Sequence, residues 1–163
     1  MSDAMVLKAQ KFINSTYNNG ATIGIKAIPE NGLTSWGVMY ALTRALQYEL
    51  GLKTLSDGFG PTTLSTLQSK FPVINASTKA PVNIIKIIQA GLYCKGYNGG
   101  NIDGVFNASV QASVSQLKKD MGVLGSYPGA GIEPKVFKGS TEYEPLYSYC
   151  PRRSCNTANS AMA

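Results

Sequence analysis

The sequence contains no histidine among its 163 residues, and this absence limits the chemistry open to the protein. Histidine is the commonest general base and the usual activator of a catalytic nucleophile, so a histidine-based active site is excluded. The three cysteines have neither histidines nor a second cysteine pair beside them to complete a zinc site. We therefore expect no metal and no other cofactor.

Cysteine is scarce, and its positions suggest different roles. Cys94 falls on a predicted helix, where a packed thiol is expected. Cys150 and Cys155 flank a short segment near the C-terminus and could close a small disulfide loop under oxidising conditions.

Acidic residues are also few and far apart in the sequence. A glycoside hydrolase needs two carboxyl groups that face each other across a cleft. Asp57 and Asp103 lie in turn-forming positions that have a structural explanation. We therefore predict that this chain is not an enzyme. The candidate acids weighed were Glu30, Glu49, Asp57, Asp103, Glu133, Glu142 and Glu144.

Long apolar runs are missing, so no membrane span is predicted. The first residues show no basic segment followed by an apolar run, so no secretory signal peptide is recognisable. The net charge of +6 suits an anionic partner such as a wall polymer. Because the lysines are scattered along the chain, nucleic acid is not expected as a partner.

Apolar residues recur at helical spacing, and no useful strand-like alternation is present. Six helices are predicted. The first covers about 6–17, the second runs from the N-cap Ser35 to Gly51, and the third from Pro61 to about 71. The fourth begins at Pro81, the fifth runs from the N-cap Asn107 to about 121, and the sixth begins at Pro134. The pattern indicates an all-α protein.

One pattern occurs twice. The first copy reads VLKAQKFI at 6–13, NG at 31–32, LQYELGL at 46–52 and FGPTT at 59–63. The second reads IKIIQAGL at 85–92, GY at 96–97, DGVF at 103–106, LKKDMGV at 117–123 and IEPK at 132–135. Both run in the order helix, glycine turn, helix, glycine turn, short helix. Two copies on one chain favour binding to a repetitive ligand, because the second contact gains effective concentration.

These motifs resemble the three-helix peptidoglycan-binding domain of bacterial and phage cell-wall hydrolases. The resemblance implies two tandem three-helix bundles with long loops, over residues 5–73 and 80–139, and an irregular tail over 140–163. It also implies non-catalytic attachment to wall glycan or stem peptide. A hydrolase domain is the partner that such a module targets, and the cell wall or the extracellular space is the expected location.

Polar-tipped aromatic residues and amides near the turns are the candidate ligand contacts, because sugar rings pack on aromatic faces while amides form hydrogen bonds. For Gln10, Gln89 and Asp103 the alternative is a structural role, in which the side chain ties a loop to its helix. For each aromatic residue the alternative is partial burial in the core. The candidates are Gln89, Tyr93, Tyr97, Asn98, Asn101 and Asp103 in the second copy, and Tyr17, Asn18, Asn31, Trp36 and Tyr40 in the first.

The leading hypothesis is therefore non-catalytic binding to bacterial peptidoglycan that targets an associated hydrolase. A helical protein–protein scaffold or oligomerisation module is the alternative, because apolar side chains such as Phe12 and Tyr40 could mediate association.

Overall fold

The computed structural model describes residues 3–17 and 25–141, and this part of the chain is helical. The prediction of an all-α protein is confirmed. The predicted tail lies outside the described residues from position 142 onward. The helices are α1 (Ala4–Tyr17), α2 (Trp36–Glu49), α3 (Pro61–Lys70), α4 (Val82–Cys94), α5 (Ala108–Asp120) and α6 (Pro134–Thr141).

Local sequence signals set the helix ends as predicted. The side chains of Ser35 and Asn107 cap α2 and α5 by accepting hydrogen bonds from the backbone N–H groups of Val38 and Val110. These bonds satisfy donors that would otherwise lack partners in the first turn. Beyond α2, Gly51 adopts a φ of 81°, the left-handed conformation that glycine enters without steric cost.

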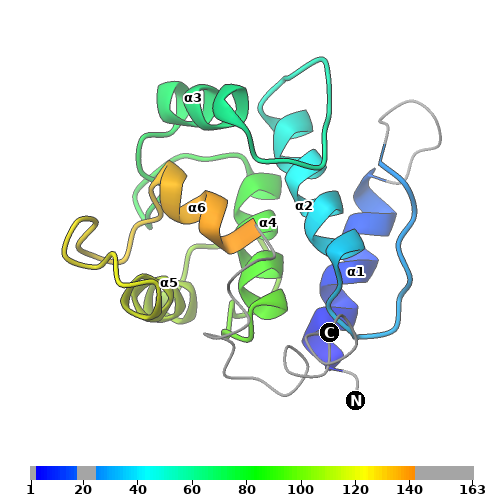
Figure 1. Ribbon diagram of the computed structural model, residues 1–163. Coiled ribbons are helices and arrows are strands. Elements are labelled where there is room, and N and C mark those ends of the chain that lie inside the picture. Colours follow the sequence, from blue (N-terminus) through cyan, green and yellow to red (C-terminus); the bar gives the residue numbers. More distant parts are fainter. Residues whose placement is uncertain (1–2, 18–24, 142–163) are drawn as a thin grey trace.

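Helix α4 is the centre of the fold and packs against α1, α2, α5 and α6 (Figure 1). Its central position follows from its composition, because buried residues occupy all of its faces rather than one stripe. Figure 1 shows α1 and α2 on one side of α4, with α5 and α6 on the other. The first helix of the second copy therefore completes the packing of the first copy.

The buried apolar side chains of both copies belong to one continuous cluster. Equivalent helices of the two copies pack on each other, α1 on α4 and α3 on α6. Phe59 and Phe137 extend this contact, with ring centroids 6.3 Å apart. The copies thus pack together, while a domain boundary between residues 73 and 80 stays a prediction.

The linker between the copies is tied to the second one by backbone pairing. Ile74 and Ile132 exchange two backbone hydrogen bonds of 3.0 and 2.7 Å in an antiparallel bridge. Gly131 lies under this bridge, where an added Cβ would come within 2.6 Å of a Val73 methyl group. The close approach explains why a residue without a side chain stands there.

Candidate functional site

The geometry that the two copies share begins with a glutamine on the first helix of each. In the first copy, the side-chain carbonyl oxygen of Gln10 accepts hydrogen bonds from the backbone N–H groups of Asn31 and Gly32, at 3.0 and 2.8 Å. Its amide group donates to the carbonyl oxygen of Leu33 at 2.8 Å and to the Asn31 side chain at 3.2 Å. The buried amide therefore clamps the loop that enters α2.

Gln89 makes the corresponding contacts in the second copy. It accepts from the backbone N–H of Gly104 at 3.0 Å and donates to the Val105 carbonyl and the Asp103 carboxylate, at 3.0 and 3.2 Å. Gly32 and Gly104 share a positive φ, of 72° and 79°. Gln10 and Gln89 thus make corresponding hydrogen bonds to a glycine turn, which is the structural role weighed for both side chains.

Asp103 is exposed at this turn, but its carboxylate already accepts hydrogen bonds within the turn. The backbone N–H of Val105 donates to it at 2.9 Å, and that bond together with the Gln89 amide holds the pKa of Asp103 below its usual value. Asn31, at the same position in the first copy, accepts from the Leu33 N–H at 3.0 Å in the same way. Both side chains therefore form Asx turns with an exposed edge.

Three candidates of the second copy are buried, which favours the structural alternative weighed for each of them over ligand contact. Gln89 is 0% exposed, and Tyr93 and Tyr97 are each 4% exposed. The Tyr93 hydroxyl donates to Asn98 and to the Gly100 carbonyl, at 2.7 and 2.6 Å, and the Tyr97 hydroxyl donates to Asp120 at 2.5 Å. Tyr97→Ala would thus test folding rather than ligand contact.

Asn98 and Asn101 remain exposed in the second copy. The Asn98 side-chain oxygen accepts from the Tyr93 hydroxyl and from the Gly100 N–H, and the Asn98 backbone carbonyl accepts from the Ser113 hydroxyl. Asn98 is therefore a structural part of its turn as well. Asn101 lies apart from it, in a groove between α1 and α4.

In the first copy, Tyr17 is buried and Asn18 lies outside the described residues. The Tyr17 hydroxyl donates to Glu49 at 2.9 Å. Burial, reinforced by the negative charge of Glu49, raises the pKa of Tyr17 well above its usual value. This tyrosine therefore serves to join α1 to α2.

Trp36 and Tyr40 form the aromatic surface of the first copy. They lie one turn apart at the start of α2, with stacked rings whose centroids are 5.8 Å apart. Tyr40 is 38% exposed, whereas Trp36 is half-buried against the core. The two candidates thus come together, with Tyr40 presented to solvent.

A pocket of about 390 Å³ lies beside Tyr40. One wall is the extended segment 25–29, and the other is α2 from Gly37 to Arg44. Asp57 closes one end, where its carboxylate lies 2.7 Å from the Arg44 guanidinium. The pocket combines an aromatic face with a charged pair, which is the chemistry of a small polar ligand site.

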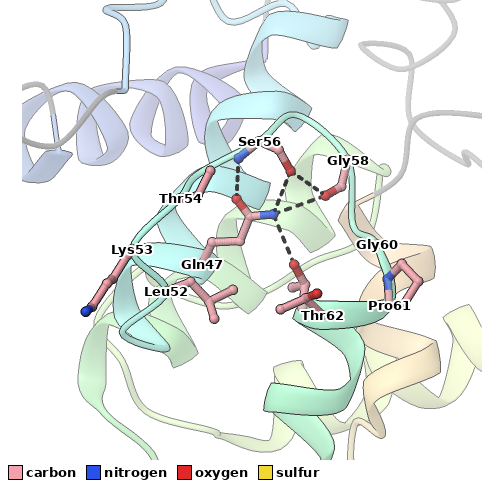
Figure 2. Close-up of a pocket in the computed structure, with 10 residues that line it drawn as sticks. Gln47, Leu52, Lys53, Thr54, Ser56, Gly58, Gly60, Pro61 and Thr62 are labelled. Atoms are coloured by element: carbon pink, nitrogen blue, oxygen red, sulfur yellow. Dashed lines mark hydrogen bonds between the residues drawn. The ribbon is translucent and has the colours of Figure 1, made fainter.

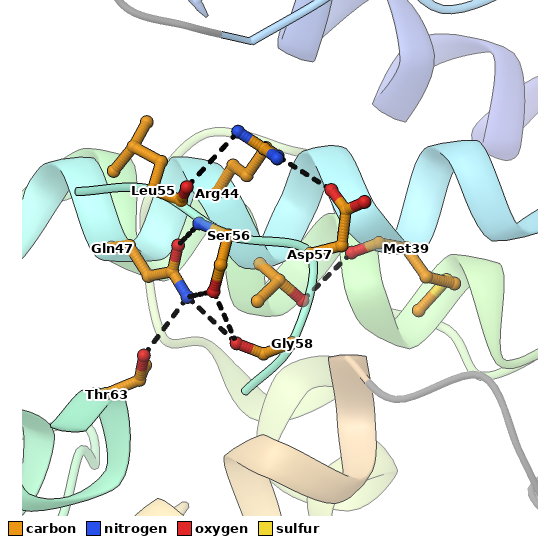
Figure 3. A network of polar contacts seen from close by, with 9 residues as sticks. Met39, Arg44, Gln47, Leu55, Ser56, Asp57, Gly58 and Thr63 are labelled. Atoms are coloured by element: carbon orange, nitrogen blue, oxygen red, sulfur yellow. Dashed lines mark hydrogen bonds and ion pairs between the residues drawn. The ribbon is translucent and has the colours of Figure 1, made fainter. Parts of the chain in front are cut away.

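Arg44 and Asp57 belong to a wider network that fastens residues 52–60 to α2 (Figure 3). The Arg44 guanidinium also donates to the Leu55 carbonyl at 3.4 Å. One turn later, the side-chain oxygen of Gln47 accepts from the Ser56 N–H at 2.8 Å, and its side-chain amide group donates to the Gly58 carbonyl at 3.0 Å. The loop that carries Asp57 is therefore held in place at several points.

A second pocket, of about 420 Å³, opens on the other side of this loop (Figure 2). Gln47 lies at its base, where its amide donates to the Thr63 hydroxyl at 3.1 Å, and Lys53 points outward at its rim. Because the polar groups at the base already bind one another, this pocket offers a ligand fewer open partners than the one beside Tyr40.

Sequence reasoning did not select Arg44 or Gln47 for the site. Gln47 had a signal, since its position in the repeat matches Lys118, and both are buried. Arg44 had no such signal, because only the folded loop brings Asp57 beside it.

In the described part of the chain, no group of three or more His, Cys, Asp or Glu side chains is placed to hold a metal ion. No helix there has the length and apolar character to cross a membrane.

Comparison with known proteins shows which family this chain matches. Residues 2–119 match the family described as FadG/YbfG, PGDB-like domain. The chain is 46% identical over 136 residues to "Uncharacterized protein FadG" of Bacillus subtilis (strain 168), covering 83% of this chain and 23% of FadG. It is 39% identical over 125 residues to "Uncharacterized protein YbfG" of the same organism, covering 76% of this chain and 16% of YbfG.

The chain therefore spans less than a quarter of the length of each of these two relatives. No solved structure matches it significantly. The family match covers well over half of the chain, including both glutamine-clamped loops and helices α1 to α4 in full. The protein belongs to the FadG/YbfG family of PGDB-like, that is peptidoglycan-binding-like, domains.

Proposed function

We propose that this chain binds bacterial peptidoglycan without catalysis, at the pocket beside Tyr40. Membership of a peptidoglycan-binding-like family supports the ligand class. The further proposal is that the module holds an associated hydrolase domain at the cell wall, outside the cell. The greater length of both relatives is compatible with such an additional domain.

The stacked pair of Trp36 and Tyr40 is the observation that carries the choice of pocket. An exposed tyrosine ring can pack on the C–H face of a sugar, and stacking on Trp36 restricts its motion. At the other end of the pocket, the Arg44–Asp57 pair offers both a donor and an acceptor to sugar hydroxyl or peptide groups. The pair is partly exposed, so a ligand can reach it.

The surroundings of the acidic residues support a non-catalytic role. Each carboxylate in the described part of the chain has a hydrogen-bond or ion-pair partner within the chain, as a structural group does. The pairs are Asp3 with Met5 N–H, Glu30 with Asn14, Glu49 with Tyr17, Asp57 with Arg44, Asp103 with Val105 N–H, Asp120 with Tyr97 and Glu133 with Lys118.

The oligomerisation alternative depended on spare apolar surface at Phe12 and Tyr40. Phe12 is half-buried and lies under the Lys86 ammonium, which is 5.8 Å from its ring centroid. Tyr40 stacks on Trp36. Phe12 therefore already has an intramolecular contact, whereas Tyr40 keeps an exposed ring; membership of a peptidoglycan-binding-like family favours wall binding as the use of that ring.

Co-sedimentation with purified peptidoglycan sacculi tests the proposal. Tyr40→Ala should weaken binding about tenfold, as expected for an aromatic anchor in a binding site. Tyr48→Ala is the matched control, because Tyr48 is 46% exposed on the same helix but does not line the pocket. Circular dichroism would establish that both variants fold.

Three outcomes would contradict the proposal. Wild-type protein that stays wholly in the supernatant at low salt would exclude wall binding. Equal binding by the two tyrosine variants would exclude this pocket. A loss of turbidity in the wall suspension would exclude a purely non-catalytic role.

A further inference from the structure

We propose that the groove between α1 and α4 is a second binding site, for a phosphodiester-linked polyol or sugar polymer. The groove has a volume of about 750 Å³ and is separate from the pocket beside Tyr40. The inference rests on the proposed wall function only for the source of the polymer, because its own site and residues are distinct.

Three lysines line the groove and give it a positive charge. Lys8 and Lys11 are exposed on consecutive turns of α1, and Lys86 projects from α4. Residues three apart on a helix lie on the same face, so Lys8 and Lys11 act on one side of the groove. Neither the Arg44–Asp57 nor the Lys118–Glu133 ion pair involves these lysines.

Two acidic groups moderate this charge. Glu30 lines the groove, where its carboxylate accepts a hydrogen bond of 3.0 Å from the Asn14 amide. Asp103 is close enough to Lys86 for that charge to help lower the pKa of its carboxyl. Positive groups still exceed negative ones along the lining, so an anionic ligand is favoured.

Phe12 gives the groove an apolar floor and holds one of its charges in place. The Lys86 ammonium lies 5.8 Å from the centre of the Phe12 ring, a cation–π distance that orders the lysine above the groove. A carbon backbone, such as that of a polyol, can pack on the ring while its charged groups meet the lysines. Ser15 and Asn101 at the edge can form hydrogen bonds with hydroxyl groups.

The basic residues of the groove suit a series of phosphate groups. The lysine ammonium binds phosphate oxygens as a compact charge, and three lysines along one groove can meet successive phosphates of a polymer. Lysine supplies all the positive charges of this groove, and arginine is not among its lining residues. Several phosphates in sequence would engage Lys8, Lys11 and Lys86 together.

The groove also depends on both copies of the repeat. The first copy contributes α1 and Glu30, and the second contributes Lys86 and Asn101. It forms only because α1 packs on α4. This dependence gives the packing of the two copies a role in binding.

Isothermal titration of the whole chain with purified poly(glycerol phosphate), across a salt series, tests the proposal. Lys8→Gln, Lys11→Gln and Lys86→Gln together should weaken binding roughly tenfold or more at low salt, because released counterions drive such association. The same triple variant should also reduce the slope of affinity against salt by about two.

A matched triple variant controls for net charge. Lys79→Gln, Lys119→Gln and Lys135→Gln remove the same charge at exposed positions outside the groove, and this protein should keep its affinity within about twofold. Equal losses in the two triple variants would overturn the groove assignment. Glu30→Gln should tighten binding modestly, because it removes a negative charge from the lining; weaker binding would count against the site.

Other polyanions distinguish the ligand class. Single-stranded DNA and vesicles containing anionic phospholipid serve as the competing probes under the same conditions. If either bound through the groove lysines as tightly as poly(glycerol phosphate), the wall-polymer assignment would be overturned. Sacculi stripped of phosphate polymer should still bind the lysine triple variant and should bind Tyr40→Ala weakly, so the two proposals fail separately.

Discussion

Lys118 occupies in the second copy the position that Gln47 occupies in the first, and each buried side chain fastens the loop that follows its helix. The Lys118 ammonium lies 2.8 Å from the Glu133 carboxylate and donates to the Gly129 carbonyl at 3.1 Å. Gln47 reaches the equivalent loop through an amide instead. The same anchoring role is thus filled by an ion pair in one copy and by neutral hydrogen bonds in the other.

Removing one member of the ion pair should destabilise the protein strongly. Lys118→Met should lower the free energy of unfolding by about 3 kcal/mol, because the largely buried Glu133 carboxylate loses its counter-charge. Urea denaturation measures the change. Lys118→Met combined with Glu133→Met should recover much of the loss, and a double variant less stable than the single one would contradict the explanation.

The two glutamine clamps should contribute similarly to stability. Gln10→Leu and Gln89→Leu should each lower the free energy of unfolding by about 2 kcal/mol, because loop N–H groups lose their acceptor. Thermal unfolding provides the measurement. Gln68→Leu, at an exposed position of α3, is the control and should leave the melting temperature almost unchanged.

Asp103 should contribute stability that depends on pH. Because folding lowers the pKa of its carboxyl, the contribution is complete above the ordinary aspartate pKa of about 3.9 and is lost as the pH falls through the lowered value. Asp103→Asn should therefore lose less stability than wild type between pH 5 and pH 2, a range of about three units around that pKa.

Asn31 in the first copy indicates that the Asp103→Asn variant can keep the turn, since it makes the same backbone contact. Melting temperatures recorded across the acid range would compare the two proteins. Parallel acid profiles would show that Asp103 does not titrate as proposed, and an NMR titration of the carboxyl would then identify its pKa directly.

Cys94 should be unreactive in the folded protein. Burial raises the pKa of its thiol to about 11, so the reactive thiolate is scarce at neutral pH and the sulfur is shielded as well. In a Cys150→Ser, Cys155→Ser background, a disulfide reagent should label Cys94 only after urea is added. Rapid labelling without urea would contradict the buried position.

The first copy should not fold cooperatively alone. In the whole chain, α1 and α2 both pack on α4, so a fragment ending at residue 79 leaves their apolar faces uncovered. Circular dichroism of that fragment should show low helicity and a broad thermal transition. A sharp transition would instead establish the first copy as an independent domain.

Much of the local structure could be predicted from short stretches of sequence. Ser35, Gly51 and Asn107 define helix ends through contacts with neighbouring residues, and apolar spacing gives the helices themselves. The two copies of the motif could also be recognised in the sequence. The structural alternative for Gln10 and Gln89 could be formulated because both glutamines hold the same position in the recurring motif.

Only the tertiary structure decided which candidates face solvent. Tyr93 and Tyr97 look like Tyr40 in the sequence, yet the packing of α4 and α5 buries the first two and leaves Tyr40 exposed. Burial depends on helices that are distant in the chain, and a residue type alone does not reveal it.

The sequence by itself therefore determined the helices, the turns, the repeat and the resemblance to a wall-binding family. The association of α1 with α4, the Arg44–Asp57 pair and the lysine groove arose only on folding. The physical reason is distance along the chain: caps and turns join residues a few positions apart, whereas the pocket beside Tyr40 and the lysine groove bring together segments that are farther apart in the sequence.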